Sequence, residues 1–70
     1  MDILKITLAA ARVNAGLAQK EAAAKLGVSN KTLSNWENGT LFPDAQQIKK
    51  ICELYVVSYD NINFLPNNPL

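Results

Sequence analysis

The 70-residue chain contains no histidine, one cysteine, and no apolar run near the ~20 residues that span a membrane. A single cysteine cannot form an internal disulfide, and without histidine the chain lacks the four Cys/His ligands of a structural zinc site. The first residues, Met1-Asp2, are acidic where a signal peptide is basic. These absences predict a cytoplasmic domain with no metal, cofactor or membrane partner, and no pattern indicates a small-molecule ligand.

An excess of one charge is also missing. Seven lysine and arginine residues stand against six aspartate and glutamate residues, which gives a net charge of +1. A nucleic-acid-binding domain is more usually clearly basic. The total charge alone therefore favours a protein-interaction module or a neutral regulator. Whether the domain could still bind DNA depends on where the charged residues lie.

Helix start and stop signals divide the chain into five predicted helices, at residues 8–15, 19–26, 30–38, 45–55 and 58–62. Thr7, Ser29 and Asp44 are the predicted caps of the first, third and fourth helices. No strand-length alternating run and no internal repeat is present. The predicted fold is all-α, one domain over residues 1–70 with a core at 3–64 and a loose tail at 65–70.

The two short helices 19–26 and 30–38 are joined by the turn Leu26-Gly27-Val28-Ser29. A turn of three to four residues with glycine is typical of a helix-turn-helix, whose second helix lies in the DNA major groove. The glycine supplies the positive φ that reverses the chain, and the valine can insert between the helices. Two small residues, Ala22 and Ala23, allow close approach. Other helical hairpins share parts of this pattern, so it indicates DNA binding without establishing it.

A larger set of motifs spans roughly residues 8–62. It consists of Leu17-Ala18-Gln19, Ala22-Ala23-Ala24-Lys25-Leu26-Gly27-Val28-Ser29, Thr32-Leu33-Ser34-Asn35-Trp36-Glu37-Asn38-Gly39, Pro43, Ile51, Val57-Ser58 and Asp60-Asn61-Ile62. These motifs resemble the phage-repressor/Cro-type helix-turn-helix family, also called the XRE family. The resemblance implies a compact five-helix lambda-repressor-like domain. It also implies a sequence-specific regulator of transcription that binds double-stranded DNA, a repressor of bacterial or phage type.

The resemblance also implies roles for individual residues. The base-reading positions fall on Asn30, Lys31 and Asn35, with Thr32 and Ser34 as secondary candidates. The phosphate-binding positions fall on Gln19 and Asn38, assisted by the backbone N–H groups around Gly39 and Thr40. The position of Gln19 also implies that it braces the recognition helix. Arg12 and Glu37 match a pair that forms a partly buried salt bridge between the first and third helices, although two exposed charges of little worth are the alternative.

The polar residues of helix 30–38 also allow a plainer interpretation, a solvated helix face. Asparagine is a middling helix former, however, so three asparagines on one helix are costly unless their amides bind something. Asparagine can pair with adenine, and lysine with guanine. Trp36 could stack on a base, but its spacing from Leu33 favours the core. Cys52 lies in the apolar stripe of helix 45–55 and is interpreted as a small core residue, not a redox switch.

Three positions depart from the family pattern. Ala18 replaces the usual Ser or Thr cap of the second helix, which loses a cap worth ~1 kcal/mol. Val56 replaces the glycine that usually follows the fourth helix. Leu41-Phe42 replaces an often basic segment and removes an expected phosphate contact, which weakens the expected affinity for DNA.

A single module of this kind makes few base contacts, so we expect a homodimer, at least on DNA, bound to a pseudo-palindromic operator. The half-site centres would lie roughly 34 Å apart. The candidate dimer surface is Leu41, Phe42, Tyr59, Ile62, Phe64 and Leu65, several of which could instead pack against helix 45–55. The alternative function is a protein-interaction module without DNA binding. No acid–base constellation supports an enzyme.

Overall fold

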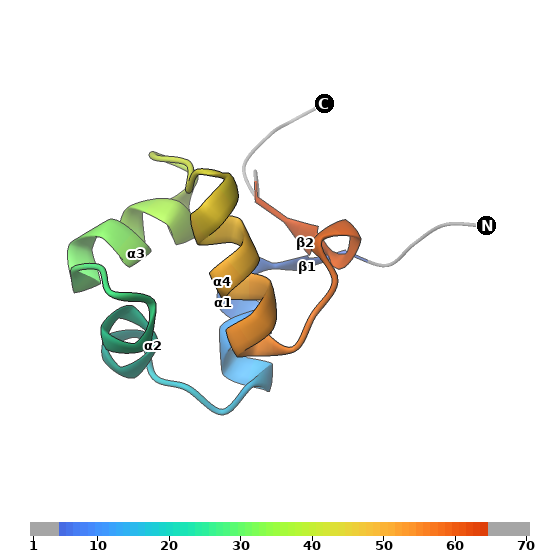
Figure 1. The fold of residues 1–70 in the computed structure, drawn as a ribbon, viewed down its shortest axis with the longest axis horizontal. Helices are drawn as coiled ribbons and strands as arrows, with labels where there is room; N and C mark the ends of the chain where they lie inside the picture. The colour runs from blue at the N-terminus through green and yellow to red at the C-terminus, as the bar shows by residue number, and fades with distance from the viewer. Residues whose placement is uncertain (1–4, 65–70) are drawn as a thin grey trace.

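The structure, a computed structural model, describes residues 5–64 (Figure 1). The elements in chain order are β1 (Ile6–Thr7), α1 (Leu8–Asn14), α2 (Gln19–Leu26), α3 (Asn30–Asn38), α4 (Ala45–Tyr55), the 3-10 turn η1 (Tyr59–Asn61) and β2 (Ile62–Asn63). The predicted tail at 65–70 and the first two residues of the predicted core lie outside the described residues. In Figure 1, α2 and α3 occupy one side of the molecule and the β1–β2 pair the other, with α1 and α4 between them.

The prediction of five helices is wrong for the end of the domain. The described residues form four α-helices, and the segment predicted as a fifth helix is the 3-10 turn η1 followed by β2. β2 pairs in parallel with β1, with Ile6 opposite Ile62 and Thr7 opposite Asn63. A strand of two residues carries no alternating pattern, so only the tertiary contact between the two ends of the domain reveals it.

The predicted caps of three helices are confirmed. Ala10 N–H donates to Thr7 Oγ1 at 3.0 Å, and Thr32 N–H donates to Ser29 Oγ at 3.0 Å. At the start of α4, Gln47 N–H donates to Asp44 Oδ1 at 2.9 Å, and the Gln47 side chain returns the bond by accepting Asp44 N–H at 2.8 Å. Each cap supplies an acceptor to a first-turn N–H that has no partner within the helix.

The core lies where the four helices and β2 meet. Its buried residues are Leu8, Ala11, Ala22, Ala23, Leu26, Leu33, Trp36, Ile51, Tyr55, Ile62 and Phe64. The core position predicted for Trp36 is confirmed, since 3% of this residue is exposed. Cys52 packs against the core, and burial, followed by the charge of Glu53, raises the pKa of its thiol.

Every helix within residues 5–64 is too short or too polar to cross a bilayer.

Candidate nucleic-acid interface

The turn between α2 and α3 has the geometry that the glycine predicts. Gly27 adopts a left-handed conformation with φ 74°, which glycine reaches without a side-chain clash. Gly27 N–H donates to Ala24 O at 3.2 Å, and Val28 N–H donates to Ala23 O at 3.0 Å. These two bonds close the end of α2 as a Schellman motif. Val28 packs against the core, so the turn is held both by hydrogen bonds and by apolar contact.

The helix α3 buries one face in the core and leaves its other faces at the protein surface. Leu33 and Trp36 lie in the core, whereas Asn30 and Lys31 in the first turn are exposed. Among the further candidate residues, Thr32, Ser34 and Asn35 are half-buried. Because residues three or four positions apart share a helix face, Lys31, Asn35 and Asn38 form a stripe along α3. The structure thus groups the predicted base-reading residues on one short helix.

Thr32 has a local bond within the N-terminus of α3. The Ser29 hydroxyl donates to Thr32 Oγ1 at 2.9 Å while it accepts Thr32 N–H. The pair therefore joins the cap to the first turn of the helix. Because of this bond, the Thr32 side chain is less free to reorient than those of Lys31 and Asn30, which are exposed at the same end of α3.

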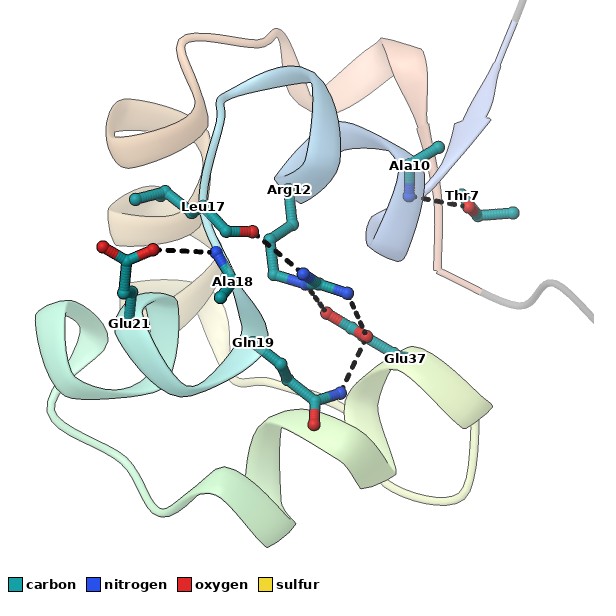
Figure 2. A network of polar contacts seen from close by, with 8 residues as sticks. All are labelled: Thr7, Ala10, Arg12, Leu17, Ala18, Gln19, Glu21 and Glu37. Atoms are coloured by element: carbon teal, nitrogen blue, oxygen red, sulfur yellow. Dashed lines mark hydrogen bonds and ion pairs between the residues drawn. The ribbon is translucent and has the colours of Figure 1, made fainter.

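An ion pair fixes the far end of α3 to α1 (Figure 2). Arg12 Nε donates to Glu37 Oε2 at 2.8 Å, and Arg12 Nη2 donates to Glu37 Oε1 at 3.4 Å. A third donor of the same guanidinium, Nη1, bonds Leu17 O at 2.9 Å. The two side chains are 14% and 8% exposed, respectively. Arg12 therefore connects α1, the α1–α2 loop and α3 through three of its N–H groups.

Gln19 joins this ion pair from the start of α2. Gln19 Nε2 donates to Glu37 Oε1 at 3.0 Å, and its carbonyl oxygen points away from Glu37 in Figure 2. The side chain therefore links α2 to α3, in line with the bracing role that the resemblance implies for Gln19. Its carboxamide group has a second N–H, so bracing Glu37 leaves one donor for another acceptor.

The N-terminus of α2 lacks a side-chain cap at Ala18, as the departure from the family pattern predicts. Glu21 compensates in part, because its Oε1 accepts Ala18 N–H at 3.0 Å (Figure 2). This is the reciprocal half of a capping box, without the half that a Ser or Thr hydroxyl would make. The spacing of Glu21 three positions after the cap is the sequence signal for this role.

The end of α3 is closed by Gly39 in a left-handed conformation with φ 80°. Gly39 N–H donates to Trp36 O at 3.2 Å, and Thr40 N–H donates to Asn35 O at 2.9 Å. The backbone donors predicted to assist phosphate binding are thus already bonded within the protein. The side chains of Asn38 and Thr40, both exposed, remain the parts of this segment that can reach a phosphate.

The predicted dimer residues divide into two groups. Ile62 and Phe64 are buried, because β2 draws this segment onto the core. Phe42 and Tyr59 are 55% and 57% exposed, and Leu41 is also exposed. Leu65 lies outside the described residues. A groove of about 360 Å³, called here the aromatic groove, is lined by Lys5, Phe42, Tyr59, Asp60, Ile62, Asn63 and Phe64.

No group of three or more metal-ligating side chains occurs within residues 5–64. The described chain therefore offers no assembled site of acidic, cysteine or histidine ligands. The chemical resources of the α2–α3 surface are amides, hydroxyls and lysine ammonium groups. Such groups bind phosphate oxygens and the edges of bases.

Known proteins resemble the chain over most of its length. A family model described as helix-turn-helix matches residues 8–62. The HTH-type transcriptional regulator ImmR of Bacillus subtilis (strain 168) is 48% identical over 50 residues, which cover 71% of this chain and 39% of that protein. The chain thus spans less than two thirds of the length of this relative. No solved structure matched the chain.

Proposed function

The chain belongs to the helix-turn-helix family of the phage-repressor/Cro (XRE) type, and from this premise we propose that it is a sequence-specific repressor of transcription that binds double-stranded DNA. The observation that carries the proposal is the braced α2–α3 unit, in which α3 presents a stripe of amides and a lysine. A recognition helix must be rigid to place side chains against base edges within hydrogen-bond distance. The Schellman turn, the Ser29 cap and the Glu37 network supply this rigidity.

In the proposed complex, α3 lies in the major groove. Asn30, Lys31 and Asn35 read the bases, with Thr32 and Ser34 in secondary roles. Asparagine matches the N6 and N7 atoms of adenine, and lysine matches the O6 and N7 atoms of guanine. Asn35 is half-buried, whereas Lys31 is exposed and its side chain would be ordered by the DNA.

The phosphate contacts are assigned to the side chains of Gln19, Asn38 and Thr40. The second N–H of the Gln19 carboxamide would reach a phosphate while the first braces Glu37. Lys20 and Lys25 on α2 are exposed and add positive charge beside α3. These few cations neutralise few phosphates, so one subunit alone would bind weakly.

A homodimer on a pseudo-palindromic operator would double these contacts, with half-site centres roughly 34 Å apart. We assign the contact between subunits to Leu41, Phe42 and Tyr59, which are exposed apolar residues near the aromatic groove. Lys5 and Asp60 line the same groove, so a two-fold axis could bring the lysine of one copy to the aspartate of the other. Sedimentation with operator DNA tests this: one protomer per site at saturation would refute the dimer.

The DNA target also implies where the protein acts. A bacterial or phage repressor works on the chromosome in the cytoplasm, and we propose the same for this chain. The proposed function requires neither an enzyme activity nor a cofactor.

Operator selection from random DNA, followed by binding measurements on variants, tests the proposal. Lys31→Ala and Asn35→Ala should each weaken binding to the selected site by ~1–3 kcal/mol and relax the preference at one base pair. Gln19→Ala should weaken binding to all sequences alike. Lys49→Ala, which removes an exposed lysine on α4, is the matched control and should leave the base preference unchanged. If Gln19→Ala changed the preference while Asn35→Ala did not, the assigned roles would be wrong.

A protein-interaction module without DNA binding is the second candidate. The exposed Leu41, Phe42 and Tyr59 favour it, because they form an apolar surface beside a groove. Retention on a heparin or DNA column separates the two functions. A DNA-binding protein elutes with rising salt, because salt competes for the phosphates. A protein that passes through at low salt would support the interaction module.

A further inference from the structure

The loop between α3 and α4 joins the proposed DNA surface to the aromatic groove (Figure 1). Thr40, whose side chain is assigned to a phosphate, is exposed at the start of the loop. Phe42, which lines the groove, follows two residues later. Two residues of extended chain span at most about 7 Å. A contact that Phe42 makes with a partner therefore lies close to the DNA backbone that Thr40 would reach.

The first half of this loop is fixed to the end of α3. Asn35 O accepts two hydrogen bonds, from Thr40 N–H at 2.9 Å and from Leu41 N–H at 3.2 Å. Gly39, in its left-handed conformation, donates its N–H to Trp36 O at 3.2 Å. Three successive backbone N–H groups are thus bonded to α3. Because Asn35 also carries a proposed base-reading amide, the loop backbone is tied to a residue that would read the DNA.

The second half of the loop is fixed to α4. Pro43 is buried, and the ring of a proline holds φ at about −65°. Asp44 follows it directly and caps α4 through the reciprocal bonds with Gln47. Loops are usually the more mobile parts of a domain. This loop instead holds Phe42, which is 55% exposed, between two fixed ends.

The aromatic groove beside Phe42 is suited to a second copy of the chain. The rings of Tyr59 and Phe64 stack in it, with their centroids 5.8 Å apart. Lys5 and Asp60 line the same groove and form no ion pair within residues 5–64. A groove with one cation and one anion is complementary to itself, because a two-fold axis can set each charge against the opposite charge of the other copy.

The apolar contact is too small to hold two free subunits together. Leu41, Phe42 and Tyr59 are 49%, 55% and 57% exposed. Three half-exposed side chains bury well under the ~800 Å² per partner of a stable interface. In the proposed complex, DNA therefore brings the two subunits together. The contact at Phe42 then forms only if the distance between the half-sites matches the position of Phe42 relative to α3.

We propose that the loop at residues 40–43 sets the separation of the two half-sites, with Phe42 as the residue that determines it. This role of the loop rests on the proposed function, and in particular on the homodimer. One extra residue moves a loop position by up to about 3.5 Å. One extra base pair moves a half-site by about 3.4 Å and turns it by about 35°. A loop that is held at both ends does not follow such a shift, so the DNA ligand is an operator of a single spacing.

Binding of the full chain to inverted repeats of the selected half-site, built at successive spacings, tests the proposal. The unmodified chain should prefer one spacing. It should bind about ten-fold more weakly when the half-sites are one base pair further apart, because the duplex must then be twisted to restore the contact. Phe42→Ala should remove most of this difference and leave binding to a single half-site unchanged. Because Phe42 is exposed, the variant should keep its fold, which circular dichroism checks.

A second variant and a control keep the result specific to the loop. Insertion of one glycine between Leu41 and Phe42 should let neighbouring spacings bind nearly as well as the preferred one, with the base preference within each half-site unchanged. Val13→Ala is the matched control, because Val13 is an exposed apolar residue on α1, outside the loop and the groove. It should leave the spacing preference as it is.

The possible failures can be told apart. Two protomers bound with equal affinity at every spacing would overturn the role of the loop. A sharp preference that survives both Phe42→Ala and the insertion would also overturn it, because the separation would then be set elsewhere. One protomer per operator would refute the loop together with the dimer. If the chain bound no DNA, single half-sites included, the proposed function itself would fail and the role of the loop with it.

Discussion

Glu37→Gln tests the network that fixes α3 to α1 and α2, because it removes one charge and hardly changes the shape of the side chain. Glu37 accepts three hydrogen bonds, two from Arg12 and one from Gln19. The substitution leaves one carbonyl oxygen in place of the two carboxylate oxygens. The Arg12 guanidinium, whose side chain is 14% exposed, then has no anion beside it.

The expected loss is large for a domain of this size. Breaking a buried pair by removing one partner costs about 3 kcal/mol or more, because the other charge stays buried. A domain of 70 residues has a total stability of about 4–10 kcal/mol. The loss should therefore lower the melting temperature by roughly 12–24 °C. Adding Arg12→Met should recover part of it, since no unpaired buried charge remains.

Urea unfolding followed by tryptophan fluorescence measures this effect directly. Trp36 is the only tryptophan and lies buried on α3, one residue before Glu37. Glu53→Gln on the exposed face of α4 is the matched control and should change stability little. If Glu37→Gln cost no more than Glu53→Gln, or if the losses from Arg12→Met and Glu37→Gln were additive, the coupled pair would be refuted.

Three further outcomes follow from local features. Val56→Gly should raise the unfolding free energy by about 1 kcal/mol, because Val56 is 88% exposed with φ 54° and glycine tolerates that conformation; thermal unfolding measures it, and an unchanged melting temperature would contradict the strain. Ala18→Ser should stabilise by ~1 kcal/mol in urea unfolding, because a hydroxyl can accept Glu21 N–H. Stability should fall as pH rises from 10 to about 12, because the pKa of Tyr55 is raised on folding and neutral phenol is favoured in the folded state; absorbance of phenolate during alkaline unfolding checks this.

The sequence predicts the four helices because each has a local signal. Ser29 and Asp44 cap α3 and α4, and Gly27 and Gly39 end α2 and α3 in left-handed conformations. These signals act within a few residues of the chain, so they can be read without tertiary structure. The end of α4 shows the limit of such reading, because Val56 takes a left-handed conformation that its residue type disfavours.

The features that were not predicted depend on contacts between distant segments. The β1–β2 pair joins residues near the two ends of the domain, and its two-residue strands have no periodicity. The resemblance implies that Gln19 braces the helix at residues 30–38, but no spacing rule identifies Glu37, 18 residues away, as its partner. The Tyr55 hydroxyl belongs to a residue that the helical pattern identifies only as apolar. Packing of α4 against the rest of the core, not local sequence, buries it.

The near-neutral total charge conceals how the charges are used. Three of the acidic side chains accept hydrogen bonds within the domain: Glu21 at the start of α2, Glu37 in the ion pair and Asp44 at the start of α4. Among the basic residues, Arg12 is the one that forms an ion pair within residues 5–64. The six lysines form no ion pair in this part of the chain and stay exposed, including Lys20, Lys25 and Lys31 on α2 and α3. The hydrogen-bond donors beside these acidic groups offset part of their negative charge. The acidic groups therefore repel a phosphate near α3 less strongly than the net charge of the chain suggests. The surface charge on α2 and α3 is therefore a better guide to a DNA-binding function than the sum over the chain.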